Sequence, residues 1–150
     1  MKHILITTIA AVVLAAQTKA AEWQLVWSDE FNSSKLDYSK WNVSEDAFGG
    51  GNQELQLYTD RLKNVRVEND KLIIEAHRDN PNIQGTQRQF SSGKIRTKHR
   101  GDWSYGKIEI RAKLPIGKGI WPAIWMLPTD EKYGPWAASG RSEEHTSELQ

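Results

Sequence analysis

A strict alternation of apolar and charged residues constrains the fold of this chain more than any other feature of its sequence. From Lys107 to Leu114 the chain reads K-I-E-I-R-A-K-L, so that every second residue is apolar. A period of two is typical of a strand with one buried and one solvated face. We therefore expect a half-buried strand over Tyr105–Leu114, ended by Pro115 and Gly117, and a further strand over Ile120–Leu127.

Other parts of the chain also have sequence patterns typical of β-strands. Asn64–Val67 and Leu72–Ala76 are rich in strand-forming residues, and the polar cluster Glu68–Lys71 between them predicts the turn of a hairpin. No apolar stripe with helical spacing occurs after the first twenty residues. Short strands separated by Gly, Pro and Asn predict a single all-β domain, a sandwich or jelly roll.

Charge and cysteine content exclude several classes of function. The chain has 20 basic and 19 acidic residues, a formal net charge of +1, which is not the basic field of a nucleic-acid-binding protein. It has no cysteine, so a disulfide framework, a thiolate metal site and a cysteine nucleophile are all excluded. Seven tryptophans offer broad apolar faces that suit either a core or a sugar-stacking surface.

The N-terminal segment is typical of an export signal. Lys2 and His3 precede the apolar run Ile4–Ala16, and Thr18–Ala20 places small residues at a cleavage site. A bilayer span needs about 20 apolar residues, more than this run provides. We expect residues 1–20 to be a secretory signal peptide, cleaved after Ala20 or Ala21. The mature protein would then be secreted or periplasmic in a bacterium, with no attachment to the membrane.

The last ten residues have a different origin from the rest. Arg141–Gln150 reads R-S-E-E-H-T-S-E-L-Q, which is polar and lacks strand or helix periodicity. The same decapeptide results when a widely used short-read sequencing adapter is translated. We therefore expect residues 141–150 to be a non-native tail, as an expression scar would be.

Two tryptophans in the expected strand Ile120–Leu127 are candidates for substrate contact. Side chains four residues apart on a strand share a face, about 13 Å apart, so Trp121 and Trp125 could support successive sugar rings. The spacing fits equally a pair that fills the core of a sandwich. Pro122 cannot donate a ladder hydrogen bond, which places this strand near a sheet edge or at a bulge.

Six blocks of sequence, in order, resemble glycoside hydrolase family 16, and its laminarinase-type endo-β-1,3-glucanases most of all. The blocks are S-D-E-F-N from Ser28, G-N-Q-E-L-Q-L-Y-T from Gly51, N-V-R-V-E-N-D-K-L-I-I-E-A from Asn64, S-G-K-I-R-T-K from Ser92, Y-G-K-I-E-I-R-A-K-L-P from Tyr105 and G-I-W-P-A-I-W-M-L-P from Gly119. The resemblance implies a concave β-jelly roll with an open cleft for a polysaccharide chain. Residues 21–140 would form about its N-terminal half.

The resemblance also implies where the catalytic acids should be. In the family, a segment like Tyr133–Gly140 runs directly into E-I-D-I-M-E, whose first Glu is the nucleophile and whose last is the acid/base. Here the pattern stops at Gly140. Glu143, His145 and Glu148 copy the spacing, but they begin two residues late and lack the apolar residues between them. We expect no catalytic residue in this chain and therefore no hydrolysis by it.

Substrate contacts carry over from the family residue by residue. They are Asn52, Glu54, Arg96, Trp121, Trp125 and Trp136. Trp136 would flank the cleaved bond, Asn52 and Glu54 would hydrogen-bond sugar hydroxyls, and Arg96 would offer paired donors to them. The alternatives are a turn stabilised by Asn52 itself and a solvated strand face at Arg96.

The resemblance implies a monomeric enzyme that needs no cofactor. Many relatives bind a structural Ca²⁺ near a residue like Glu30, so a Ca²⁺ site in that region stays open. The substrate would be β-1,3-glucan or mixed β-1,3/1,4-glucan, cleaved internally with retention of configuration. Two alternatives stand beside this one: a non-catalytic β-glucan-binding protein of the same fold, and a truncated reading frame without function.

Overall fold

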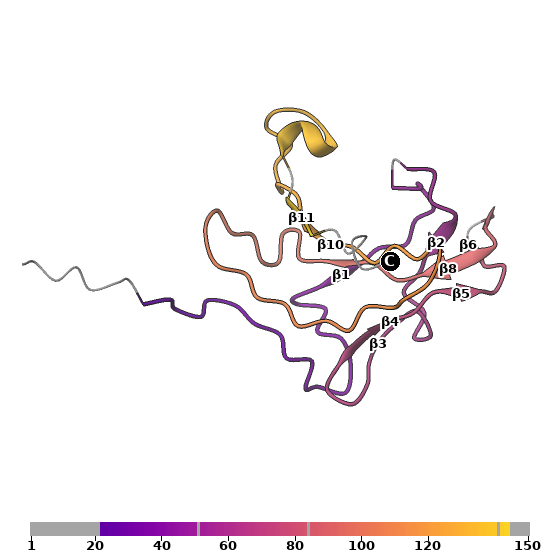
Figure 1. Ribbon diagram of the computed structural model, residues 1–150, viewed down its shortest axis with the longest axis horizontal. Coiled ribbons are helices and arrows are strands. Elements are labelled where there is room, and N and C mark those ends of the chain that lie inside the picture. The colour runs from indigo at the N-terminus through magenta and orange to yellow at the C-terminus, as the bar shows by residue number, and fades with distance from the viewer. Residues whose placement is uncertain (1–21, 51, 84, 141, 145–150) are drawn as a thin grey trace, which may run out of the picture.

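The structure is a computed structural model that describes residues 22–50, 52–83, 85–140 and 142–144 (Figure 1). The expected signal peptide and most of the expected tail lie outside the described residues. The elements are β1 (Asn42–Val43), β2 (Gln56–Tyr58), β3 (Val65–Val67), β4 (Leu72–Ile74), β5 (His77–Arg78), β6 (Asn82–Ile83), β7 (Thr86–Gln87), β8 (Phe90–Ser92), β9 (Ile95–Arg96), β10 (Ile124–Met126), the 3₁₀ turn η1 (Trp136–Ser139) and β11 (Ser142–Glu144). The predicted all-β class is confirmed.

The strands form small sheets rather than one continuous layer. The largest has the order β2-β8-β5, in which β2 and β8 run parallel and β5 and β8 antiparallel. The other sheets among the described residues are four antiparallel pairs: β1 with β9, β3 with β4, β6 with β7 and β10 with β11. The buried apolar residues are Leu36, Leu57 and Val65, so the apolar core is small and lies beneath β2 and β3.

The predicted hairpin is confirmed. Strands β3 and β4 pair antiparallel, with Val65 opposite Ile74 and Val67 opposite Leu72. Asn69 and Asp70 form the tip with φ of 52° and 54°, and the Glu68 N–H donates to the Lys71 carbonyl at 2.9 Å. Two consecutive left-handed residues are the signature of a type I′ turn, whose twist matches that of the strands. Asn and Asp tolerate this conformation better than other non-glycine residues.

A buried polar side chain, that of Asn64, joins three segments at the centre of the structure. Its Nδ2 donates to the Glu75 carbonyl and to Ser91 Oγ, both at 3.0 Å. Its Oδ1 accepts from Thr59 Oγ1 at 2.6 Å and from Arg61 Nε at 3.2 Å. Asn64, Thr59 and Ser91 are fully buried, and all four of the amide's main hydrogen-bonding positions are used. A saturated buried network fixes one arrangement of the strands that it joins.

An acidic group lies at the margin of this network. Asp79 forms ion pairs with Arg61, at 3.1 Å, and with Lys63. Burial raises the pKa of the Asp79 carboxyl, but the hydrogen bonds from Lys63 and Ser91 and the charges of both cations outweigh burial and lower that pKa. The folded state therefore favours the ionised carboxylate.

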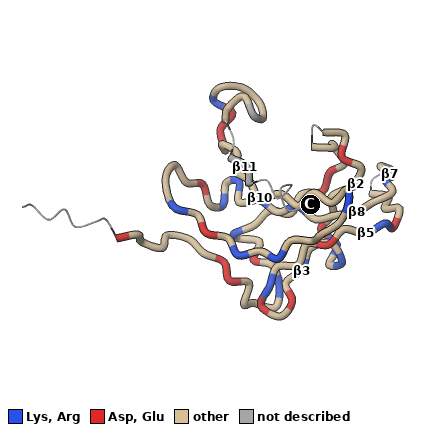
Figure 2. Tube along the Cα trace, viewed as in Figure 1, with Lys and Arg blue, Asp and Glu red and all other residues tan. Residues whose placement is uncertain are grey.

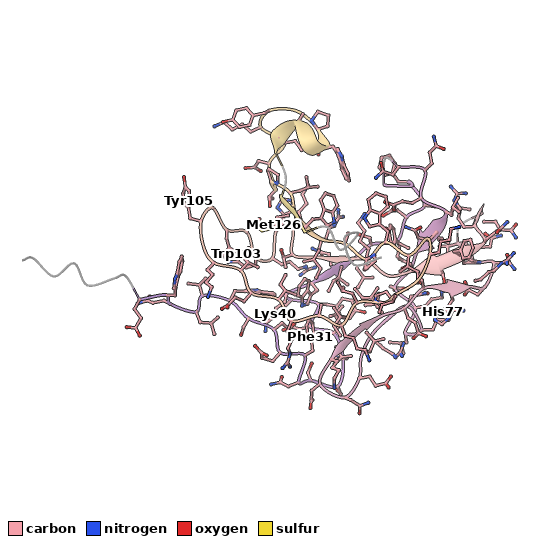
Figure 3. The ribbon with its side chains drawn as sticks, viewed as in Figure 1. Phe31, Lys40, His77, Trp103, Tyr105 and Met126 are labelled. Carbon is pink, nitrogen blue, oxygen red and sulfur yellow. The ribbon has the colours of Figure 1, made fainter. Side chains whose placement is uncertain are left out.

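Aromatic rings anchor residues 22–41, the described part of the N-terminal segment, in which no strand is formed. The Trp27 ring meets the rings of Trp41 and Trp103 edge to face, with both centroid distances at 5.3 Å. Phe31 stacks on Trp41 at 6.0 Å, and the Trp41 indole N–H donates to Asp29 Oδ2 at 2.7 Å. Figure 3 labels two of these residues, Phe31 of the N-terminal segment and Trp103 from later in the chain. Such aromatic pairs stabilise by about 0.5–1.5 kcal/mol each beyond their burial.

The strand expected over Tyr105–Leu114 is absent from the structure, and the prediction was wrong here. The segment runs as an extended trace without strand pairing, drawn in orange in Figure 1, and Ile108 and Ile110 are 53% and 60% exposed. Tyr105 projects away from the chain (Figure 3). A strand forms only when a neighbour completes its hydrogen-bond ladder, and no described segment pairs with this one.

The strand expected over Ile120–Leu127 needs correction as well, because it is shorter and spans only Ile124–Met126. Residues 142–144, within the expected tail, form β11, whose backbone pairs with β10 so that Glu143 lies opposite Trp125. Pairing of backbones does not need an alternating side-chain pattern, which this segment lacks.

Lys and Arg residues are interspersed with Asp and Glu residues along the described chain (Figure 2). Among the described residues, no helix has the length and the hydropathy that a membrane span requires.

Candidate functional site

Strand alternation separates a buried face of the β2-β8-β5 sheet from a more open one. Leu57 in β2 and Ser91 in β8 lie opposite each other and are buried. Gln56 lies opposite Phe90, and Tyr58 opposite Ser92, with all four half-buried. Because neighbouring strands keep side chains of one register on one side, these four residues share the open face.

A cluster of three polar side chains lies on this face and includes the predicted residue Glu54. Its Oε2 accepts hydrogen bonds from Gln56 Nε2 and from the Tyr58 hydroxyl, both at 2.8 Å. Gln56 Nε2 also lies 2.8 Å from the Tyr58 oxygen. Burial raises the pKa of the Tyr58 phenol, and the hydrogen bond to Glu54 and its charge raise it further, so Tyr58 remains a donor at all ordinary pH values.

A cation completes the cluster. Lys94 Nζ lies 4.9 Å from the centroid of the Tyr58 ring, within the range of a cation–π contact. The open face of this sheet therefore presents a carboxylate, an amide, a phenol and an ammonium group side by side. Such an arrangement can donate hydrogen bonds to a neutral polyhydroxylated molecule and accept hydrogen bonds from it. We call Glu54, Gln56, Tyr58 and Lys94 the Glu54 cluster.

The glycine-rich turn before Glu54 positions its carboxylate. The N–H groups of Asn52 and Glu54 both donate to the Gly49 carbonyl, at 2.9 and 3.1 Å. Gly50 has a φ of 55°, and a Cβ placed there would lie 2.5 Å from Glu54 Cδ. The carboxylate therefore rests against Gly50, where any side chain would displace it.

Asn52 itself is exposed at the tip of this turn. Among the described residues its side chain makes no hydrogen bond, and the turn is closed by backbone groups instead. The alternative role of Asn52 as a turn-stabilising side chain thus has no support in this geometry. Its contact with a sugar stays a prediction.

Arg96 is exposed on β9, two residues after Lys94 of the Glu54 cluster. It lines an open hollow of about 450 Å³ together with Asn42, Lys98 and Arg100. Arg100 Nε donates to Asn42 Oδ1 at 2.8 Å, and Asn42 Nδ2 donates to the Lys98 carbonyl at 2.9 Å. Lys94, unlike Arg96, lies against the Tyr58 ring.

The predicted tryptophans lie near the C-terminal end. Trp125 is half-buried on β10, and its ring meets the ring of Trp136 edge to face at 5.0 Å with an interplanar angle of 61°. Trp136 is 44% exposed and begins η1 with a φ of 57°. The structure therefore brings these two predicted residues together.

Trp121 does not join this pair through a strand. Because β10 begins at Ile124, the shared strand face expected for Trp121 and Trp125 is not formed. Trp121 is 62% exposed, which does not fit a residue that fills a core. The contact of these three tryptophans with sugar stays a prediction.

Sequence reasoning missed Tyr58 and Phe90 and gave Lys94 no role of its own. The alternation of Glu54, Gln56 and Tyr58 was available as a signal, since these residues must share a face of any strand over this segment. The contact of Lys94 with Tyr58 depends on the parallel pairing of β2 and β8, which the sequence does not specify.

No metal centre is evident in the described ranges, where no three His, Asp or Glu side chains lie close enough together to bind an ion. Glu30, in whose region a Ca²⁺ site stays open, is exposed. His145 and Glu148 lie outside the described residues, as does the side chain of Glu143.

The chain is similar to known proteins in family, in sequence and in structure. The model of the glycosyl hydrolases family 16 matches residues 37–136. The β-glucanase of Rhodothermus marinus is 51% identical over 118 residues, which are 77% of this chain and 40% of that protein. The glucan endo-1,3-β-glucosidase A1 of Niallia circulans is 47% identical over 131 residues, which are 80% of this chain and 19% of that protein.

The similar solved structures agree with the family match. The laminarinase of Rhodothermus marinus superposes with a TM-score of 0.70 at 46% identity, over 79% of this chain and 46% of that one. The catalytic domain of the endo-1,3-β-glucanase of Thermotoga petrophila RKU-1 gives a TM-score of 0.74 at 41% identity, over 81% and 50%. The chain thus spans half or less of the length of these relatives, and its strands are those of about half a laminarinase jelly roll. This chain belongs to the glycosyl hydrolases family 16.

Proposed function

We propose that this chain supplies sugar-binding residues to an endo-hydrolase of β-1,3-glucan, or of mixed β-1,3/1,4-glucan. One observation carries the proposal: the family match over residues 37–136 contains all six residues predicted to bind substrate. The curated relatives named above are a glucan endo-1,3-β-glucosidase and a β-glucanase. The Glu54 cluster and the exposed tryptophans have the chemistry that a neutral polysaccharide needs, namely hydrogen-bonding groups beside aromatic faces.

The hydrolytic step itself needs groups that the printed sequence lacks. Retaining hydrolysis uses two carboxyl groups about 5–5.5 Å apart, one as nucleophile and one as acid/base. The pattern E-x-D-x-x-E does not occur in the 150 residues. We infer that the acid pair of the whole protein follows Gly140, and that the 150-residue chain binds substrate weakly at most and does not cleave it.

A chimera tests this function. Residues 22–140 of this chain would replace the matching N-terminal part of the Rhodothermus marinus β-glucanase, whose own second half would then complete the domain. We expect the chimera to release reducing sugar from laminarin, because its cleft would combine this chain's binding residues with that enzyme's second half. The 150-residue chain, assayed beside it, should release none. A folded chimera without activity on laminarin or on mixed-linkage glucan would contradict the proposal.

The same chimera ranks substrates within the family. A keratan-sulfate endo-1,4-β-galactosidase from Sphingobacterium multivorum is 31% identical over 137 residues, so galactan hydrolysis is a competing specificity. Higher turnover of agarose or keratan sulfate than of laminarin would mean that the substrate is a galactan and not a glucan.

A second candidate function is glucan binding without hydrolysis. Two β-1,3-glucan-binding proteins, from Penaeus monodon and Tenebrio molitor, are 50% and 49% identical over 50 and 51 residues. The feature that separates the two candidates is the acid pair after Gly140. Its absence from the whole protein would favour the binding function.

Three further properties are part of the proposal. Residues 1–20 act as a secretory signal peptide, so the whole protein is secreted or periplasmic. It acts there as a monomer. Residues 141–150 are a non-native tail, so the pairing of β11 with β10 occupies a position that another segment holds in the whole protein. Edman sequencing of the exported protein should begin at Ala21 or Glu22; a start at Met1 would contradict the signal.

A further inference from the structure

An open hollow lies beside the Glu54 cluster, and Glu54 is the one residue of its lining that the sequence predicts to bind substrate. It has a volume of about 610 Å³, within the range of about 300–1,000 Å³ for small-molecule sites. Glu54 forms one wall, and the segment Gln87–Phe90 with Asn80 forms the other. Glu54 thus borders both the Glu54 cluster and this hollow.

The polar side chains on the second wall are not used by the protein. Within the described ranges, the side-chain amides of Asn80, Gln87 and Gln89 make no hydrogen bond, and all three residues are exposed. An amide carries two donors and an acceptor with two lone pairs. Three such groups around one hollow provide donors and acceptors at several angles, as the hydroxyls of a sugar ring require.

An aromatic ring lies between the amides and the Glu54 cluster. Phe90 is half-buried on β8, opposite Gln56 of the cluster, and therefore shares the open face of the sheet. The Arg78 guanidinium lies 5.9 Å from the centroid of the Phe90 ring. A ring partly open to a polar hollow suits the apolar C–H face of a pyranose.

The wall is held in place by hydrogen bonds to backbone carbonyls, so the amides are presented on a defined support. Strands β6 and β7 form a hairpin, and the Asn80 N–H donates to the Gln89 carbonyl at 3.2 Å. Arg88 Nη2 donates at 3.1 Å to the carbonyl of Ala47, which precedes the glycine-rich turn. The hairpin is thereby tied to the same turn that positions Glu54.

Charge indicates a neutral ligand. Glu54 is the acidic residue on the hollow's lining and Arg88 the basic one, and Arg88 is engaged with the Ala47 and Gln87 carbonyls. Neither a phosphate nor a cation would find a matched set of charges among these lining residues. The remaining groups are amides and an aromatic ring.

We propose that this hollow is an outer subsite for one further glucose unit of a glucan chain whose neighbouring units contact the Glu54 cluster. Asn80, Gln87 and Gln89 hydrogen-bond the hydroxyls of that unit, and Phe90 supports one face of its ring. The inference rests on the proposed function, because it presumes a glucan in the cleft. It adds a length preference: the site distinguishes long chains from short ones.

The double variant Gln87→Ala/Gln89→Ala tests the subsite in the chimera defined above. Its kcat/KM is measured on β-1,3-linked oligosaccharides of three and of six glucose units, beside the unmodified chimera. Loss of two hydrogen bonds to the outer unit should lower kcat/KM for the hexasaccharide about tenfold and leave the value for the trisaccharide unchanged. Asn82→Ala is the matched control, since Asn82 is an exposed amide of the same hairpin that does not line the hollow.

Each outcome decides the matter. Equal losses on both oligosaccharides would mean that the amides act through the fold or through Glu54, and would overturn the subsite. No loss on either would also overturn it, as would the same loss in Asn82→Ala. A chimera that cleaves neither oligosaccharide before any substitution would instead count against the proposed function. The chimera's thermal unfolding, compared between variants, shows that each protein remains folded.

Discussion

Substitution of Gly50 by alanine separates the role of the glycine-rich turn in the fold from its role at the site. Gly50 has a φ of 55°, where an L-residue costs about 1–2 kcal/mol of stability. The added Cβ would also lie 2.5 Å from Glu54 Cδ, so the carboxylate must move away. That movement breaks the hydrogen bonds from Gln56 and Tyr58, each at 2.8 Å. The structure thus assigns Gly50→Ala both a backbone cost and a change at the site.

Gly85→Ala is the matched control. Gly85 has a φ of 82°, yet no atom lies within 4 Å of a Cβ placed there. We expect the two variants of the chimera to lose similar stability, about 1–2 kcal/mol, in denaturant unfolding. Only Gly50→Ala should raise KM for laminarin, by about tenfold for about 1.4 kcal/mol of lost binding to the displaced Glu54. It should also lower the pKa of Tyr58 in a spectroscopic titration, because Glu54 helps to raise that pKa. Equal KM values for the two variants would refute the assigned role of Glu54.

Three further predictions concern the chimera. Asn64→Ala should lower the free energy of unfolding by about 2–4 kcal/mol, because its buried partners lose their hydrogen bonds; a loss below 0.5 kcal/mol would contradict this. Trp125→Ala should raise the free-energy barrier of glucan turnover by about 1–3 kcal/mol, the stacking energy that is lost, while the thermal unfolding of the variant remains cooperative. Unfolding of the variant without a separate effect on turnover would instead indicate a core residue. Because the pKa of Asp79 is lowered on folding, its contribution to stability is present above the ordinary pKa of about 3.9 and is lost as pH falls through the lower folded value. Asp79→Asn should therefore flatten the acid side of a plot of melting temperature against pH, and an unchanged slope would oppose this.

Features fixed by neighbouring residues were predictable from the sequence. The β3–β4 hairpin depends on two strand-forming runs and on a turn at Asn69 and Asp70, all within a dozen residues. The all-β class depends likewise on local patterns repeated along the chain. Both predictions are confirmed because the interactions that decide them are short-range.

Features that depend on distant partners were not predictable. The segment Tyr105–Leu114 has the pattern of a strand, but a pattern supplies no partner for the hydrogen-bond ladder, and the described chain has none for it. The Glu54 cluster needs the register of β2 against β8, which brings Lys94 to Tyr58. The edge-to-face contact of Trp125 with Trp136 needs the 3₁₀ turn that begins at Trp136. None of these follows from spacing alone.

The reading of the genomic DNA beyond the codon for Gly140 tests the central claim most directly. The claim is that this chain forms about half of a glucan hydrolase whose acid pair follows Gly140. We predict that the reading frame continues with Glu-x-Asp-x-x-Glu and about another hundred residues, as the half-length match to the laminarinases indicates. A genomic sequence that truly encodes R-S-E-E-H-T-S-E-L-Q after Gly140 would contradict it.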